Sequence, residues 1–470
     1  MNLKKAFIFF TCSLFIGLAF IPATECKTID GLIVPIINVD TSASKNGTHL
    51  EGGWLEEQNG IKILHVSGSH YDMGYQHGYF LGNEIGESMR AELFGFEKMG
   101  YTYDKLLAIW NIMKIYLPDE YKDEMQGMAD GSGISFDNIS VLTTMPAVFN
   151  VLVEDACCEI SLWGDATLDG KLYHARSLDW SLDVYDPVTG IPLYENIILI
   201  VRNPTVGYAS LVPEFAGSIG CWHGINEKGI AVGENTCITN DSTFHGICPW
   251  IRMRMVLDYA STSGEAINIL VSNRTCGTNF VLSDANQPIG YALDQTANLS
   301  YVGTWDNPVE GLQPFWQIKD VVRRVPQYVN PQCAALEHHR YRYDPGGFLG
   351  FFLFASQKSY MFIGWTHYKA LSKEIKKRYG SLDLNGTMSL LRDEYVGDTN
   401  FVMKIIRVSK FHGLQCLCQW VCCPDTGDIV ISFARNNTLA CYNQVYYFNM
   451  FDLFHSDPPK TTISEIQLSR

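Results

Sequence analysis

The residues best suited to covalent chemistry lie in two neighbouring runs of the chain. Cys157 opens an apolar run that ends at Trp163, and Arg176 and Asp179 stand in a second run that follows the turn Leu168-Asp169-Gly170. Two such runs joined by a turn predict a β-hairpin. In that register Arg176 and Asp179 lie near Cys157, and a guanidinium beside a thiol favours the thiolate. A packed thiol next to a structural ion pair explains the same residues.

A fourth candidate, Asn235, follows a second turn. The segment Gly224-Ile225-Asn226-Glu227-Lys228-Gly229 predicts a turn that feeds a strand, and this strand carries Glu234 and Asn235 at its far end. The amide of an asparagine at that position can donate a hydrogen bond to an oxyanion. A strand-end asparagine that serves only local backbone groups is the alternative interpretation, and Asn226 is interpreted as a turn residue.

These motifs together resemble a known family. The segment His70 to Gly78, the hairpin ending in Arg176-Ser177-Leu178-Asp179-Trp180 and the Gly224 to Gly229 turn are similar to the acyl-coenzyme A:6-aminopenicillanate acyltransferase-like cysteine peptidases. They resemble the choloylglycine hydrolases more remotely. The resemblance runs from about Ile61 to a late hairpin around Pro424-Asp425-Thr426-Gly427. It implies an α+β fold, the αββα four-layer sandwich of N-terminal-nucleophile (Ntn) hydrolases.

The resemblance also implies a mechanism. The chain is expected to cut itself between Ala156 and Cys157, which leaves Cys157 as both nucleophile and N-terminus. A free α-amino group has a pKa of about 7.7–8.0, so it can take the proton of the thiol near neutral pH. The thiolate then attacks an amide carbonyl to give a thioester. Arg176 and Asp179 match the residues beside the nucleophile, Asn235 matches the oxyanion donor, and no metal or cofactor is expected.

The sequence departs from the family pattern at two points. Members usually follow the nucleophile with Thr or Ser, whereas Cys158 and Glu159 follow it here. Because the predicted strand continues to Trp163, we favour Cys157 over Cys158 as the nucleophile. The remoter branch carries a second site asparagine, and no residue of this chain matches it clearly.

The predicted organisation has three parts. Lys4, Lys5 and the apolar run from Ala6 to Ile21 predict a signal peptide over residues 1–25, and an export route would make the protein secreted or lumenal. Residues 26–156 are expected to form a mainly helical small chain, and residues 157–470 the catalytic domain. The 14 cysteines permit full disulfide pairing once Cys12 leaves with the signal and Cys157 is set aside. Glycosylation sequons occur at Asn46, Asn138, Asn240, Asn273, Asn298, Asn385 and Asn436.

Local patterns predict several elements that position these residues. Residues 27–60 are interpreted as a leader loop, Ile61 to Val66 as a strand, and Ser69 as the N-cap of a helix that is stabilised by Asp72. Gly74 and Gly78 share one face of that helix and allow another element to approach closely. Further helices are expected from Tyr103 and Pro118, with a loop at residues 130–133. A zinc interpretation of Cys416, Cys418, Cys422 and Cys423 is set aside, since their spacing is not the paired type.

The composition and net charge limit the classes of partner that the protein can bind. Of the 470 residues 47% are hydrophobic, and the net charge of -15 disfavours a nucleic-acid partner. Beyond the signal, the sequence predicts no membrane span. The predicted function is therefore that of a self-processing cysteine Ntn hydrolase. Its expected partners are a small-molecule N-acyl substrate and its own cleaved N-terminal chain. An acyltransferase that passes the acyl group to an amine and a catalytically silent binding protein are the alternatives.

Overall fold

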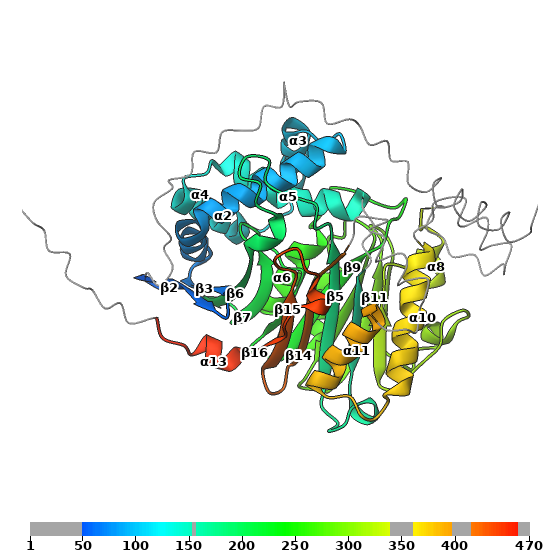
Figure 1. The fold of residues 1–470 in the computed structure, drawn as a ribbon. Helices are drawn as coiled ribbons and strands as arrows, with labels where there is room; N and C mark the ends of the chain where they lie inside the picture. Colours follow the sequence, from blue (N-terminus) through cyan, green and yellow to red (C-terminus); the bar gives the residue numbers. More distant parts are fainter. Residues whose placement is uncertain (1–48, 153–156, 339–360, 397–414, 459–470) are drawn as a thin grey trace, which may run out of the picture.

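The chain folds into two β-sheets that pack face to face, with helices on both outer sides (Figure 1). The computed structural model describes residues 49–152, 157–338, 361–396 and 415–458. Residues 1–25, and therefore the predicted signal peptide, lie outside the described residues, as do Asp155 and Ala156. The αββα four-layer arrangement that the resemblance implied is confirmed.

The larger sheet has ten strands. All of its neighbours pair antiparallel except β3 and β6, which are parallel. A parallel pair needs a long connection, and here helices α2 to α5 and the first two strands of the other sheet lie between β3 and β6 in the chain. In spatial order the strands are β1 (His49–Leu50), β2 (Gly53–Gln58), β3 (Ile61–Gly68), β6 (Ile197–Pro204), β7 (Ser210–Phe215), β8 (His223–Asn226), β9 (Ile230–Thr236), β10 (Thr278–Asp284), β11 (Ile289–Gln295) and β12 (Ser300–Gly303).

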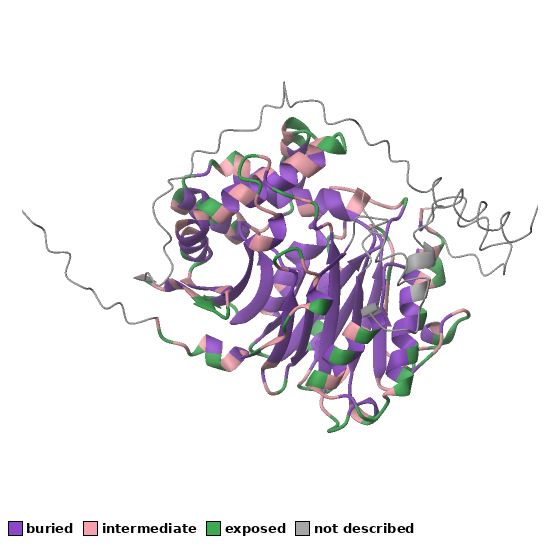
Figure 2. Cartoon of the chain, in the orientation of Figure 1, coloured by how far each residue is buried: buried purple, intermediate pink, exposed green. Residues whose placement is uncertain are grey.

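The smaller sheet has six strands, all paired antiparallel. Its strands β4 and β5 contact β9 of the larger sheet, and β4 also contacts β10 and β11, so the two sheets share one interior. Figure 2 shows that the strands of both sheets are mostly buried. In spatial order they are β13 (Val321–Arg324), β4 (Cys158–Leu162), β5 (Tyr173–Trp180), β14 (Gln415–Cys423), β15 (Asp428–Phe433) and β16 (Tyr446–Asn449).

Helices cover the outer face of each sheet (Figure 1). The larger sheet is covered by α2 (His70–Lys98), α3 (Tyr103–Met113), α4 (Asp119–Ser132), α5 (Phe136–Leu152), α6 (Pro249–Tyr259) and α7 (Ser263–Leu270). The smaller sheet is covered by α10 (Met361–Lys377) and α11 (Leu384–Val396). Shorter pieces are α8 (Pro331–Ala334), α13 (Met450–Phe454) and the 3-10 turns η1 (Gly164–Ala166), η2 (Leu193–Asn196), η3 (Pro308–Gly311) and η4 (Ala440–Tyr442).

The start of α2 follows the sequence prediction closely. Ser69 and Asp72 form a capping box, in which each side chain bonds the backbone of the other. A Cβ at Gly74 would lie 1.9 Å from the carbonyl oxygen of Glu124, and one at Gly127 would lie 2.1 Å from that of Tyr71. Glycine is therefore required on both α2 and α4, and the close approach predicted for Gly74 is confirmed.

Two local predictions are wrong. The leader loop at residues 27–60 includes β1 and β2 among the described residues, because the hairpin β2–β3 extends the edge of the larger sheet. The loop at residues 130–133 is helical as far as Ser132, since α4 ends only where Gly133 adopts a left-handed φ of 75°. The region before Cys157 is mainly helical, but it also supplies three strands to the sheet.

The cysteines show a further difference from prediction. Within the described ranges, free thiols are found at the buried positions Cys221, Cys248, Cys276, Cys333, Cys416, Cys418, Cys422 and Cys423. The pairing that the cysteine count permitted is not made at these positions. In the part of the chain that the structure describes, no helix combines the length and apolarity needed to cross a bilayer.

Candidate active site

The hairpin of β4 and β5 brings three of the predicted residues together. Its register pairs Cys158 with Ser177 and Glu159 with Arg176, so Cys157 stands beside the end of β5. Arg176 Nη2 lies 3.6 Å from Cys157 Sγ, and the backbone N–H of Asp179 donates to the same sulfur at 3.4 Å. Both donors favour a thiolate at Cys157. The contact of Asp179 that the geometry establishes is thus made by its main chain.

The two adjacent cysteines face opposite sides of the smaller sheet. Side chains alternate along a strand, so Cys157 and Cys158 cannot share a face. Cys158 packs with Ile160 and Leu162 in the core under α10 and α11. Cys157 packs in the other core, which the larger sheet, its helices and the inner face of the smaller sheet form. The contacts with Arg176 and Asp179 belong to Cys157, so the geometry supports Cys157 as the reactive thiol.

Glu234 completes the surroundings of Arg176. The Nη2 atom that reaches the thiol also lies 3.5 Å from Glu234 Oε1, and Nη1 donates to the carbonyl oxygen of Trp222. Trp250 Nε1 donates to the same Glu234 oxygen at 3.1 Å. The guanidinium is therefore held between a thiol and a carboxylate that is itself anchored. Sequence reasoning named Glu234 only as a strand residue; its position next to Asn235 was the available signal.

Asn235 lies on the opposite sheet and faces the shared interior. Its register partner on β10 is Asn279, whose amide donates to the carbonyl oxygens of Val325 and Gln327 at 2.9 and 2.7 Å. Residues paired across two strands share a face, and Val325 directly follows β13 of the smaller sheet. Asn235 is fully buried, and neither polar atom of its amide has a hydrogen-bond partner among the described residues. Its donor capacity is therefore unused.

A different cluster lies on the other face of β4. The metal-binding atoms of Cys158, His367 and Glu394 lie within 4.8 Å of one another, and all three residues are buried. His367 Nδ1 lies 3.1 Å from Glu394 Oε1. Thiolate, imidazole and carboxylate are donors that zinc accepts. Because this cluster faces α10 and α11, it lies outside the candidate site.

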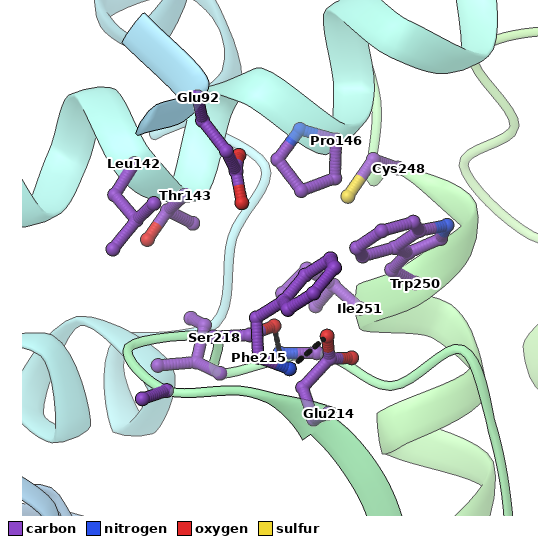
Figure 3. Close-up of a pocket in the computed structure, with 13 residues that line it drawn as sticks. Glu92, Leu142, Thr143, Pro146, Glu214, Phe215, Ser218, Cys248, Trp250 and Ile251 are labelled. Carbon is purple, nitrogen blue, oxygen red and sulfur yellow. Dashed lines mark hydrogen bonds between the residues drawn. The ribbon is translucent and has the colours of Figure 1, made fainter. Parts of the chain in front are cut away.

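A pocket opens next to the site, between α2, α5, α6 and the end of β7 (Figure 3). It is a small pocket that is partly open to solvent. Trp250 lines this pocket and also donates to Glu234, so it connects the pocket to Arg176. The ring of Trp180, which follows Asp179, lies 5.8 Å from Phe215 and 6.2 Å from Trp250.

Comparison with known families identifies a matching segment. The family model described as "Acyl-coenzyme A:6-aminopenicillanic acid acyl-transferase" matches residues 175–298. The predicted family resemblance is confirmed. The matching segment includes Arg176, Asp179 and Asn235 and begins after Cys157. It supports an acyltransferase-like or amide-hydrolase-like fold.

Curated relatives share part of the chain. An uncharacterized protein of Archaeoglobus fulgidus is 26% identical over 247 residues, which is 46% of this chain and 40% of that protein. Protein dcd1B of Dictyostelium discoideum is 24% identical over 60% of this chain and 59% of its own length. Protein dcd1A of the same organism is 27% identical over 48% and 52%. The chain thus spans about half the length of these relatives.

Two solved structures show distant similarity to this chain. A variant of the conjugated bile acid hydrolase from Clostridium perfringens is 15% identical, with a TM-score of 0.38, over 64% of this chain and 94% of that one. A Caenorhabditis elegans N-acylethanolamine-hydrolyzing acid amidase ortholog is 12% identical, with a TM-score of 0.36, over 62% of this chain and 100% of that one.

Proposed function

We propose that this protein is a self-processing cysteine hydrolase that cleaves a small N-acyl amide through a thioester. The contact of Cys157 Sγ with Arg176 Nη2 at 3.6 Å and with the Asp179 N–H at 3.4 Å carries the proposal. A buried thiol with two such donors, placed directly before strand β4, suits a nucleophile. The family match over residues 175–298 agrees with this chemistry.

The proposed reaction begins with cleavage of the bond between Ala156 and Cys157. The new α-amino group of Cys157 takes the proton of its thiol, and Arg176 stabilises the thiolate. The sulfur attacks the amide carbonyl carbon, and the negative charge moves to the carbonyl oxygen. Asn235 Nδ2 is the proposed donor to that oxyanion.

The intermediate then collapses. The C–N bond breaks, and the departing amine takes a proton from the ammonium group of Cys157. Water attacks the resulting thioester after the same amino group accepts one of its protons. The S–C bond breaks, which releases a carboxylic acid and restores the thiol. Glu234 acts as a positioning residue, because it contacts the guanidinium of Arg176.

Sequencing the cut chain tests the proposal directly. The purified protein is run on a denaturing gel, and the N-terminus of the larger fragment is sequenced. A fragment that starts at Cys157 supports the proposal. A single intact chain with no amidase activity would overturn it, and a fragment that starts at Cys158 would move the nucleophile to the other face of β4.

The fate of the acyl group distinguishes hydrolase from transferase. The cut protein is incubated with N-acyl amides of different acyl lengths, with and without an added primary amine. We expect free carboxylic acid as the main product in both conditions. A new amide as the main product would show a transferase, and no turnover of any amide would show a silent binding protein.

We further propose that residues 1–25 direct export of the chain. The sequons at Asn240, Asn273, Asn298, Asn385 and Asn436 support this, because all five asparagines are exposed. Expression in a glycosylating host tests it. The expected protein is secreted, has lost residues 1–25 and runs at lower mass after glycosidase treatment. A protein retained inside the cell with Met1 or Asn2 at its N-terminus would contradict export.

A further inference from the structure

The pocket beside the site combines apolar walls with two carboxyl groups. Figure 3 shows the side chain of Glu92 entering from α2 and that of Glu214 lying at the end of β7, on the other side of the space. The ring of Phe215 lies between them, and the ring of Trp250 lies to one side. The remaining walls are mainly aliphatic, with Leu142, Pro146, Ala216, Ile219 and Ile251.

Both carboxyl groups have unused hydrogen-bonding capacity. Glu214 is fully buried; its Oε1 accepts from the Phe215 N–H at 2.9 Å, but its Oε2 has no hydrogen-bond partner in the described ranges. Glu92 is 9% exposed, and no described ion pair or hydrogen bond joins it to another side chain. A buried carboxyl group without a partner is unfavourable. A ligand that supplies the missing donors would remove this cost.

Burial favours the protonated form of both carboxyl groups in the pocket. Burial raises the pKa of Glu92 to about 8. Burial also raises the pKa of Glu214 well above its usual value, against the opposing effects of the Phe215 N–H, Arg202 and Arg176 and with a contribution from Glu92. The thiol of Cys248 also lines the pocket, and burial raises its pKa to about 12, so it stays protonated. A cation entering here meets carboxyl groups that can ionise in response.

We propose that this pocket binds the ammonium group of a ligand, with Glu92 and Glu214 as its charge partners and the rings of Phe215 and Trp250 beside it. Carboxylates and aromatic faces are the groups that recognise an organic cation. This inference rests on the proposed function for its role: the pocket would hold the basic end of an N-acyl amide. Trp250 joins the pocket to Glu234, and Glu234 contacts the guanidinium that reaches Cys157.

Binding of a cation should depend on pH. At low pH both carboxyl groups are protonated, and the ligand must displace a proton to form the ion pair. Affinity for an ammonium ion therefore rises from about pH 6 to about pH 8, where Glu92 ionises in the free protein, and protons are released on binding. The cation itself stays charged over this range, because an alkylamine has a pKa of about 10.

Direct binding of a small probe tests the inference without any turnover. Calorimetric titration compares n-butylammonium chloride with 1-butanol, its neutral counterpart, on the full protein. We expect the ammonium to bind at least about tenfold more tightly, as one charged hydrogen bond requires. The variants Glu92→Gln and Glu214→Gln should each remove most of this preference, and the double variant all of it. Glu227→Gln, an exposed residue outside the pocket, is the control.

The outcomes separate this inference from the proposed function. Equal binding of ammonium and alcohol, or an unchanged preference in the double variant with a native circular dichroism spectrum, would overturn the pocket assignment. If the variants lose ammonium binding but the wild type does not cut itself, the pocket assignment stands and the proposed hydrolase function is overturned. Where the protein is active, kcat/KM for an amide with a terminal ammonium should fall about tenfold in Glu92→Gln, while kcat/KM for its neutral analogue stays unchanged.

Discussion

The two faces of β4 place two adjacent cysteines in different surroundings. On the face toward the larger sheet, Cys157 meets a guanidinium and a backbone N–H. On the face toward α10 and α11, Cys158 lies in an apolar core beside the His367–Glu394 pair. Cysteine thus belongs to the candidate site on one face and to the apolar core on the other. Neighbouring groups, and not the thiol itself, set the chemistry.

The strongest test of this difference replaces each cysteine in turn. Cys157→Ala should abolish self-cleavage and lower turnover by more than about 10³-fold, because the proposed nucleophile is lost. Cys158→Ala should still cut and retain activity within about twofold, while losing about 1 kcal/mol of stability from the core. Gel analysis and product release measure both. An uncut Cys158→Ala protein with normal thermal unfolding would reverse the assignment of the two faces.

Asn235 should give the next largest effect. Removing an oxyanion donor typically lowers kcat by about 10²–10³-fold, so Asn235→Ala should show this loss with little change in KM. Asn268→Ala, at an exposed position on α7, is the matched control and should behave as the wild type. Steady-state kinetics on the cut enzymes provides the measurement. If the loss of kcat only matches the fraction of protein that is unfolded, Asn235 has a structural role alone.

Glu234 tests whether the charge beside Arg176 tunes the thiol. Glu234→Gln keeps an acceptor for Trp250 but removes the carboxylate that lies 3.5 Å from the guanidinium. Loss of a negative charge lowers the pKa of a nearby thiol and of a nearby ammonium group. The acid limb of the kcat/KM profile should therefore move to lower pH, with kcat/KM changed about tenfold at its maximum. If the acid limb of the kcat/KM profile does not move, Glu234 has only a packing role.

A substitution on the face of β4 toward α10 and α11 should change stability and not activity. His367→Gln removes one partner of a buried pair and leaves Glu394 in an apolar layer, so the free energy of unfolding should fall by about 3–5 kcal/mol. Activity per folded molecule should stay within about twofold. Urea unfolding and active-site titration measure the two quantities. If dialysis against a chelator lowers the unfolding midpoint of the wild type, a metal ion and not a simple pair holds Cys158, His367 and Glu394 together.

Local features were predictable because their causes are local. A short connection, residues 163–172, joins β4 to β5, and the register of this hairpin places Arg176 and Asp179 beside Cys157. The cap at Ser69 and the close approach at Gly74 follow from residues within a few positions of each other. The end of α4 was missed because Gly131 and Ser132 are compatible with both a loop and a helix; packing of α4 against α2 favours the helix.

Features that join distant segments were not predictable. Glu214 and Glu92 share a pocket although they are far apart in the chain, and nothing in either segment points to the other. The contact of Glu234 with Arg176 requires two different sheets to meet. The cluster of Cys158, His367 and Glu394 likewise needs α10 and α11 to cover the smaller sheet.

The sequence by itself determined that Cys157 and Cys158 point in opposite directions, because side chains alternate along any strand. It also determined which strand lies next to them, through the hairpin turn. Only the tertiary structure decided which direction leads to a guanidinium and which to an apolar layer. What covers each face of a sheet depends on contacts between residues hundreds of positions apart, and these form only when both sheets and their helices pack together.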